Sequence, residues 1–188
     1  MSITALIAVD VQADFLPGGL LAVPSGDLVV APLQALAQRF PLVVATRDFH
    51  PAHHASFEAQ GGPWPPHCVI GTPGAHLHPA IDALAWLVIS KGTDPAVDAY
   101  SGFDGTRLAE MLRAVGVHRL VIGGLATDYC VRATALAAQK EGFEAAVVLD
   151  AIRAVDVHAG DGEQTLQEMR SAGISLQTLA EMAAEDTR

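Results

Sequence analysis

Residues 121–131 read VIGGLATDYCV, and this stretch indicates how the whole chain folds. The aliphatic residues before Gly123 predict a buried strand, the two glycines predict a turn, and the alanine-rich sequence after Cys130 predicts a helix. Thr127 or Asp128 is the expected helix cap, because a short side-chain oxygen can accept from the first unpaired N–H groups. Cys130 then falls in the first turn, where the helix dipole lowers the pKa of a thiol. We interpret Cys130 as a nucleophile whose neighbouring amides receive an oxyanion; the alternative is a buried structural cysteine.

The composition excludes several classes of protein. A chain of 188 residues predicts one domain, here 1–188, with a core made mostly of aliphatic side chains. The net charge of −10, without a cluster of Lys or Arg, argues against nucleic acid or an anionic membrane as a partner. Two cysteines, with neither a signal peptide nor a long apolar run, predict a cytoplasmic protein without disulfides. Both a monomer and a homodimer are compatible with this composition.

Short aliphatic segments alternate with segments of helical periodicity along the chain. The expected strands are 3–9, 42–46, 85–90, 119–122, 145–149 and 174–177, and the expected helices are 27–39, 104–115, 130–141 and 162–172. Continuous aliphatic strands predict a parallel sheet covered by helices on both faces, which is an α/β fold with three layers. The composition of residues 51–80 indicates a long loop that carries function. The polar residues 179–188 are expected to form a frayed, peripheral tail.

Three polar residues follow different predicted strands: Asp10, Lys91 and Cys130. Ligands of such sheets bind at the carboxyl ends of the strands, so these side chains are expected to meet there. Asp10 can take the proton of the thiol, Lys91 can stabilise the thiolate, and the set suits acyl transfer from a small amide. Taken singly, Asp10 is more simply explained as a loop carboxylate and Lys91 as a solvated lysine.

A second cluster begins at Asp48 and His50, directly after the second predicted strand, and continues through His53 and His54 to His67. One carboxylate with imidazoles suits a divalent ion such as Zn, Mn or Fe, with positions left for water or substrate. Asp48, His50 and His67 are the strongest candidate ligands, and His54 is a further candidate. The other histidines, which are His53, His76, His78, His118 and His158, are expected at the surface. Cys68 is interpreted as a small buried side chain.

Several motifs together resemble the nicotinamidases of the isochorismatase-like cysteine hydrolase superfamily. They are DVQADF (10–15), RDFHP (47–51), WPPHC (64–68), SKG (90–92), YSGF (100–103) and GLATDYCV (124–131). The match runs in order from about residue 3 to residue 180. The Cys130 motif alone indicates the superfamily, whereas Asp48, His50 and His67 with Trp64-Pro-Pro indicate the nicotinamidase branch.

The resemblance implies a six-stranded, mostly parallel sheet and the hydrolysis of nicotinamide, and of pyrazinamide, in NAD salvage. It implies Cys130 as nucleophile, Asp10 as proton shuttle and Lys91 as the polarising residue. It also implies one divalent ion, most simply zinc, that holds the pyridine nitrogen. The expected oxyanion donors are the amides of Ala126 and Cys130, after a cis peptide between Leu125 and Ala126. The expected substrate-contacting residues are Phe15, Trp64, Tyr100 and Leu125, although Phe15 and Tyr100 could also be ordinary core residues.

Three other functions remain open from the sequence. An N-carbamoyl amidase would share the triad, but such relatives generally lack the metal ligands. A vinyl-ether hydrolase of the isochorismatase type would not need a nucleophilic cysteine. A metal-binding protein without catalysis is the third alternative, and the intact set of Asp10, Lys91 and Cys130 argues against it.

Overall fold

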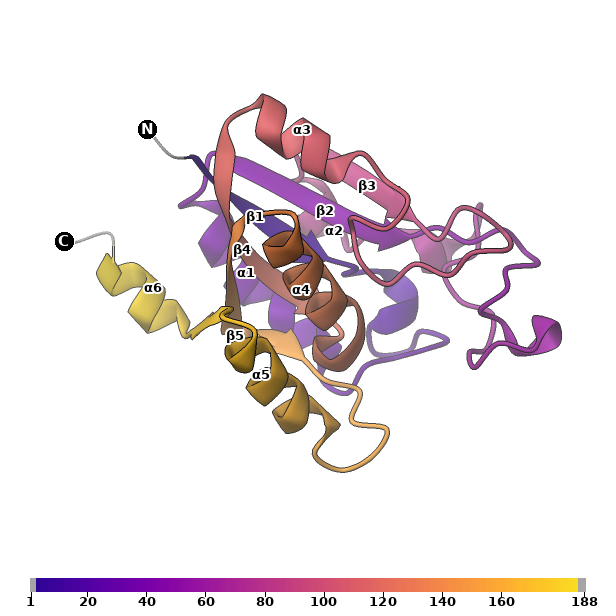
Figure 1. The fold of residues 1–188 in the computed structure, drawn as a ribbon. Coiled ribbons are helices and arrows are strands. Elements are labelled where there is room, and N and C mark those ends of the chain that lie inside the picture. Colours follow the sequence, from indigo (N-terminus) through magenta and orange to yellow (C-terminus); the bar gives the residue numbers. More distant parts are fainter. Residues whose placement is uncertain (1–2, 186–188) are drawn as a thin grey trace.

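The computed structural model describes residues 3–185, which form a parallel sheet between two layers of helices (Figure 1). The strands are β1 (Ile3–Val9), β2 (Leu42–Asp48), β3 (Leu87–Lys91), β4 (Val117–Leu125), β5 (Glu144–Arg153) and β6 (Ser175–Gln177). Their order in the sheet is β3-β2-β1-β4-β5-β6, and every neighbouring pair is parallel. The predicted fold class and the six-stranded sheet are confirmed.

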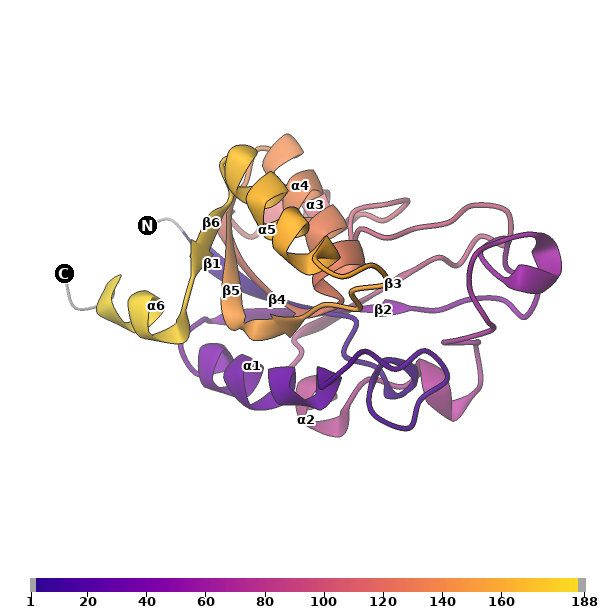
Figure 2. The same cartoon turned by 90° about the horizontal axis from the view of Figure 1, so that it is seen from below.

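The helices are α1 (Val30–Ala37), α2 (Pro79–Asp82), α3 (Leu108–Ala114), α4 (Arg132–Lys140), α5 (Asp161–Ser171) and α6 (Leu179–Glu185). In Figure 2, α1 and α2 lie below the sheet, whereas α3, α4 and α5 lie above it. The central strands are mostly aliphatic because both of their faces are buried. In β1, for example, Leu6 and Ala8 join the core beneath α1, while Ala5, Ile7 and Val9 join the core beneath α3 and α4.

Most helices and strands lie where the sequence predicted them, but several are longer or shorter than predicted. β4 and β5 extend beyond the predicted 119–122 and 145–149, because both continue to the edge where the loops of the site begin. The predicted helix 27–39 begins as a tight 3₁₀ turn at Gly26–Val29 and becomes α-helical only at Val30. The short helix α2 begins in the last two residues of the segment expected to be a loop.

The prediction of a frayed tail at 179–188 is wrong for residues 179–185, which form α6. Met182 is only 2% exposed and packs in the same core as Leu33 and Leu36 of α1. The Arg39 guanidinium also donates to the Met182 carbonyl, which holds α6 against the end of the first helix. Residues 186–188 of the predicted tail lie outside the described residues. Within the described part of the chain, no helix is both long and apolar enough to cross a membrane.

Candidate active site and metal centre

The candidate site lies at the carboxyl ends of four adjacent strands. Asp10 follows β1, Asp48 ends β2, Lys91 ends β3, and Cys130 follows β4. The chain leaves β1 in one direction to form β2 and β3 and returns to the other side of β1 with β4. The strand order therefore reverses between β1 and β4, which is where open parallel sheets bind their ligands.

Lys91 brings the predicted triad together. Lys91 is 1% exposed, and its Nζ lies 2.9 Å from Asp10 Oδ2 and donates to Cys130 Sγ at 3.4 Å. Nζ also donates to the Ala99 carbonyl at 3.3 Å and forms an ion pair with Asp48 Oδ1. Asp10 is fixed from the other side by the Thr46 hydroxyl, which donates to Oδ1 at 2.6 Å. Within residues 3–185, Asp10 Oδ2 has the Lys91 ion pair but no directed hydrogen bond, so its lone pair remains available to a proton.

The two buried carboxylates beside Lys91 have opposite pKa shifts. Burial raises the pKa of Asp10, and the nearby Lys91 only partly offsets this effect. Burial acts in the same direction on Asp48, but Lys91 and His50 outweigh it and hold its pKa well below the usual range. Burial lowers the pKa of Lys91, whereas the charges of Asp10 and Asp48 raise it more strongly, so Lys91 stays cationic. This divergence is typical of a site in which one carboxyl group carries protons and the other stays ionised.

The lowered thiol pKa expected for Cys130 is wrong for the free site. Burial raises the pKa of the Cys130 thiol well above its usual range, and although Lys91 lowers it, the charges of Asp10 and Asp48 raise it further. The sequence argument considered the helix dipole alone and could not include full burial beside two carboxylates. Cys130 is therefore a thiol in the free site, and the predicted role as nucleophile requires that its proton leave.

The turn that carries Cys130 is π-helical, spans Thr127–Val131 and runs directly into α4. The predicted cap is wrong, because neither Thr127 nor Asp128 caps the turn and Ala126 occupies the cap position without a side-chain hydrogen bond. The Asp128 carboxylate instead accepts from the N–H groups of Val155 at 3.0 Å and Asp156 at 2.9 Å. The peptide between Leu125 and Ala126 is cis, as the family resemblance predicted.

Asp48, His50 and His67 bring three ligand atoms within 4.8 Å of one another, and all three residues are buried. The Nε2 atoms of His50 and His67 lie 3.6 and 3.8 Å from Asp48 Oδ2. These separations are close to the roughly 3.3 Å expected between ligands at the corners of a tetrahedral zinc site. Nδ1 of His50 lies 2.9 Å from the Gly92 carbonyl, and Nδ1 of His67 lies 2.8 Å from the Pro65 carbonyl.

These carbonyl contacts decide how the two imidazoles are oriented. A carbonyl oxygen can only accept, so each Nδ1 carries a proton, and Nε2 is the nitrogen of each ring that faces Asp48 and can bind a metal ion. Phe57, which is also buried, packs against the rings of His50 and His67 with centroid distances of 5.6 Å in both cases. The carboxylate and the two imidazoles, oriented in this way and surrounded by buried side chains, fit a divalent metal ion.

His54 is buried beside this cluster but has other contacts. Its ring stacks on His50 with 4.1 Å between centroids, while Nδ1 lies 2.7 Å from Ser56 Oγ and Nε2 lies 3.1 Å from the Val97 carbonyl. Its role as a further ligand stays a prediction.

The other histidines are not part of the cluster of Asp48, His50 and His67. His53, His76, His118 and His158 are exposed, and His78 accepts from the Ala80 N–H. Cys68 is fully buried, as expected.

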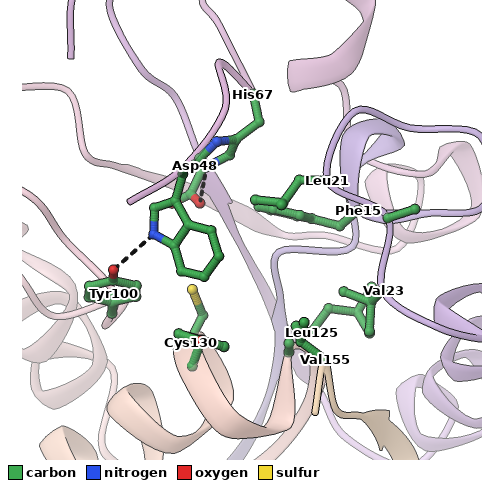
Figure 3. Close-up of a pocket in the computed structure, with 13 residues that line it drawn as sticks. Phe15, Leu21, Val23, Asp48, His67, Tyr100, Leu125, Cys130 and Val155 are labelled. Atoms are coloured by element: carbon green, nitrogen blue, oxygen red, sulfur yellow. Dashed lines mark hydrogen bonds and ion pairs between the residues drawn. The ribbon is translucent and has the colours of Figure 1, made fainter. Parts of the chain in front are cut away.

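A pocket opens in front of Cys130, and its residues come from six separate segments (Figure 3). The predicted residues Phe15, Trp64, Tyr100 and Leu125 all line it, together with Asp48, His67, Ala126 and Cys130. Trp64 Nε1 donates to the Tyr100 hydroxyl at 3.0 Å, which fixes one wall. In Figure 3, Phe15 and Leu21 lie across the pocket from Tyr100, and the sulfur of Cys130 points into the space between them.

The sequence did not reveal five residues of this pocket: Leu21, Ala22, Val23, Tyr129 and Val155. Four of them lie in irregular loops without hydrophobic periodicity, so no pattern distinguishes them from ordinary loop residues. Tyr129 precedes the nucleophile, and its ring contacts Trp64 edge-on with 5.0 Å between centroids. The only available signal for Tyr129 was its position beside Cys130.

Comparisons with known proteins agree with this geometry. The sequence profile of the isochorismatase domain matches residues 4–181. The chain is 42% identical to the nicotinamidase/pyrazinamidase of Mycobacterium tuberculosis, over 92% of this chain and 97% of that protein. It is similar to the crystal structure of the pyrazinamidase of Pyrococcus horikoshii in complex with zinc, with 48% identity, a TM-score of 0.86, and coverage of 94% of this chain and 99% of that one. It also resembles PnC1 from L. infantum in complex with nicotinate, with 37% identity, a TM-score of 0.90, and coverage of 96% and 94%.

Proposed function

This chain belongs to the isochorismatase family, and from that premise we infer that it is an amide hydrolase that converts nicotinamide to nicotinate and ammonia, and pyrazinamide to pyrazinoate. The observation that carries this proposal is the position of Asp48. Its carboxylate faces Lys91 of the triad with one oxygen and the two histidines with the other. One member of the triad, Cys130, and two of the proposed ligands, Asp48 and His67, line the same pocket. A small aromatic amide with a ring nitrogen can reach both ends of such a pocket.

The pocket wall suits a flat heteroaromatic ring. Phe15 and Leu21 form one side, and Trp64, Tyr100 and Tyr129 form the other, so a ring can pack between apolar surfaces. We propose that Asp48, His50 and His67 hold one divalent ion, with zinc as the first candidate. When bound, this ion acts as a Lewis acid that orients the substrate through its pyridine nitrogen and withdraws electrons from the ring.

The first half of the reaction uses the three residues around Lys91. Asp10 takes the proton of the Cys130 thiol, and the sulfur attacks the amide carbon to form a C–S bond. The amides of Ala126 and Cys130 are proposed to stabilise the resulting oxyanion. Asp10 then returns the proton to the amide nitrogen, the C–N bond breaks, and ammonia leaves a thioester on Cys130.

The second half reuses the same residues in reverse order. Asp10 takes a proton from water as the water oxygen attacks the thioester carbon. The C–S bond breaks and the sulfur recovers the proton from Asp10. The carboxylic acid that forms loses its remaining proton to solvent and is released as nicotinate. Lys91 stays charged throughout and stabilises whichever of Asp10 and Cys130 is anionic at each step, which is consistent with its raised pKa.

The decisive experiment measures ammonia release from nicotinamide by the purified protein, before and after chelation and after zinc is restored. We expect turnover that is lost with the metal and returns with it. Cys130→Ala should abolish turnover while keeping its metal, because Cys130 contributes no ligand to the proposed metal set. Turnover by Cys130→Ala, or no turnover by the zinc-loaded protein, would contradict the proposal.

A further inference from the structure

Gln12 is fully buried next to the candidate site, and its side chain forms hydrogen bonds with both the N–H and the carbonyl of Asp48. The Gln12 carbonyl oxygen accepts from the Asp48 N–H at 2.7 Å, and its amide nitrogen donates to the Asp48 carbonyl at 2.8 Å. The amide nitrogen also donates to the Ala75 carbonyl at 3.1 Å. Both N–H hydrogens and the oxygen of the Gln12 amide are therefore used.

This arrangement takes the place of a strand neighbour. The ladder between β1 and β2 pairs Ala8 with Ala45, and the main chain of β1 turns away at Asp10, which has a positive φ of 48°. Asp48 lies beyond that ladder and is paired on its other side with Lys91 of β3. The Gln12 amide supplies to Asp48 the donor and the acceptor that the main chain of β1 no longer reaches.

The position of Asp48 matters more than that of an ordinary strand residue, because its carboxylate has two sets of partners. Oδ1 pairs with Lys91, and Oδ2 lies 3.6 Å from His50 Nε2 and 3.8 Å from His67 Nε2. A shift of the Asp48 main chain would move both oxygens at once. Metal ligands are sensitive to such shifts, and the loss of a supporting hydrogen bond typically weakens metal binding 10–100-fold.

We propose that Gln12 is a positioning residue that sets the main chain of Asp48 and thereby fixes both the metal-ligand geometry and the Lys91 ion pair. The inference rests on the proposed metal site of this hydrolase. Gln12 itself does not line the pocket, so it acts through Asp48 and not on the substrate. Its contribution is the pairing of a donor and an acceptor, which a side chain of equal size without an amide cannot replace.

The test compares Gln12→Met, which keeps most of the volume, with Gln12→Glu, which keeps the acceptor but loses both N–H donors. Zinc affinity is measured by competition with a chromophoric chelator, without substrate. We expect both variants to bind zinc about 10–100-fold more weakly than the parent protein. Cobalt(II) gives a second readout, because its absorption reports ligand geometry, and the spectrum of Gln12→Met should differ from that of the parent.

Thr134→Val is the matched control. Thr134 is also fully buried, and its hydroxyl accepts from a main-chain N–H, that of Gly102, at 3.1 Å. The Thr134→Val variant should lose thermal stability, but its zinc affinity and its cobalt spectrum should match those of the parent protein. Unchanged zinc affinity in the Gln12 variants, or an equal loss in Thr134→Val, would overturn the proposal. Because no substrate is used, a selective loss in the Gln12 variants would support the positioning role even if nicotinamide proved not to be hydrolysed.

Discussion

Asp48 and Lys91 form a buried ion pair that joins the candidate triad to the candidate metal ligands. Lys91 is thereby shared by two carboxylates, since Asp10 Oδ2 lies 2.9 Å from the same nitrogen. A buried cation with two anionic neighbours is costly to remove, because its removal leaves buried charges without a partner. This relationship leads to the first prediction.

Lys91→Met should lower both stability and activity. At neutral pH we expect the free energy of unfolding to fall by about 3–5 kcal/mol, because the carboxylates of Asp10 and Asp48 lose their common cation. The turnover number for nicotinamide should fall by about 10²-fold or more, since the thiolate loses its stabilising charge. Urea unfolding and an ammonia assay measure the two effects. Lys140→Met, at an exposed site in α4, is the control and should change neither.

Asp10→Asn should change how stability depends on pH. Burial raises the pKa of Asp10, so the folded protein binds this proton more tightly than the unfolded chain. The stability from protonated Asp10 is therefore present at low pH and is lost as pH rises through the raised pKa. Asn cannot titrate, so the melting temperature of the variant relative to the parent should increase from about pH 4 to about pH 8. Thermal unfolding of the metal-free proteins tests this, and a difference that is constant with pH would refute it.

His50→Ala and His54→Ala should differ in their metal content. His50 presents Nε2 toward Asp48, so its removal should leave the protein without stoichiometric metal. Both nitrogens of His54 face Ser56 and Val97, so His54→Ala should retain about one ion per chain with weaker binding, because the stack on His50 is lost. Elemental analysis after dialysis distinguishes them. Equal loss in both variants would make His54 a fourth ligand.

Asp128→Ala should raise KM for nicotinamide more than it lowers kcat. The Asp128 carboxylate holds the N–H groups of Val155 and Asp156, and Val155 lines the pocket. Without these bonds that wall is released, so ground-state and transition-state binding both weaken. Steady-state kinetics measure the change. Asp150→Ala is the control, because Asp150 also accepts from a main-chain N–H, that of Leu179, but does not line the pocket.

The sequence predicted the chemistry of the site better than its electrostatics. Asp10, Lys91 and Cys130 could be grouped because each follows an aliphatic strand, and parallel strands end at one edge. The same argument placed Asp48 and His50 at the end of β2. The thiol pKa of Cys130 was predicted in the wrong direction, because it depends on burial and on two carboxylates that come from distant parts of the chain.

The remaining errors come from contacts that leave no periodic pattern. Asp128 looked like a helix cap because of its position, but its carboxylate has two partners in the loop after β5. The segment 179–185 was expected to be a polar tail, but Met182 is buried in the core and the Arg39 guanidinium donates to its carbonyl, and both contacts are with residues distant in sequence. The N–H groups of the pocket residues Leu21 and Val23 donate to the carbonyls of Asp14 and Phe15. The pocket residue Val155 is held by the distant Asp128 carboxylate.

The protonated state of Cys130 also determines how the free protein responds to oxidants. Peroxides attack thiolates and spare thiols, and they need access to the sulfur. Cys130 lines the open pocket, so a small peroxide can reach the sulfur, but burial raises the pKa of the thiol and leaves the free site little thiolate for oxidation to a sulfenic acid. In the proposed mechanism the sulfur becomes a thiolate only as Asp10 takes its proton in the presence of substrate. The burial that keeps the sulfur protonated would then also protect it from oxidants between turnovers.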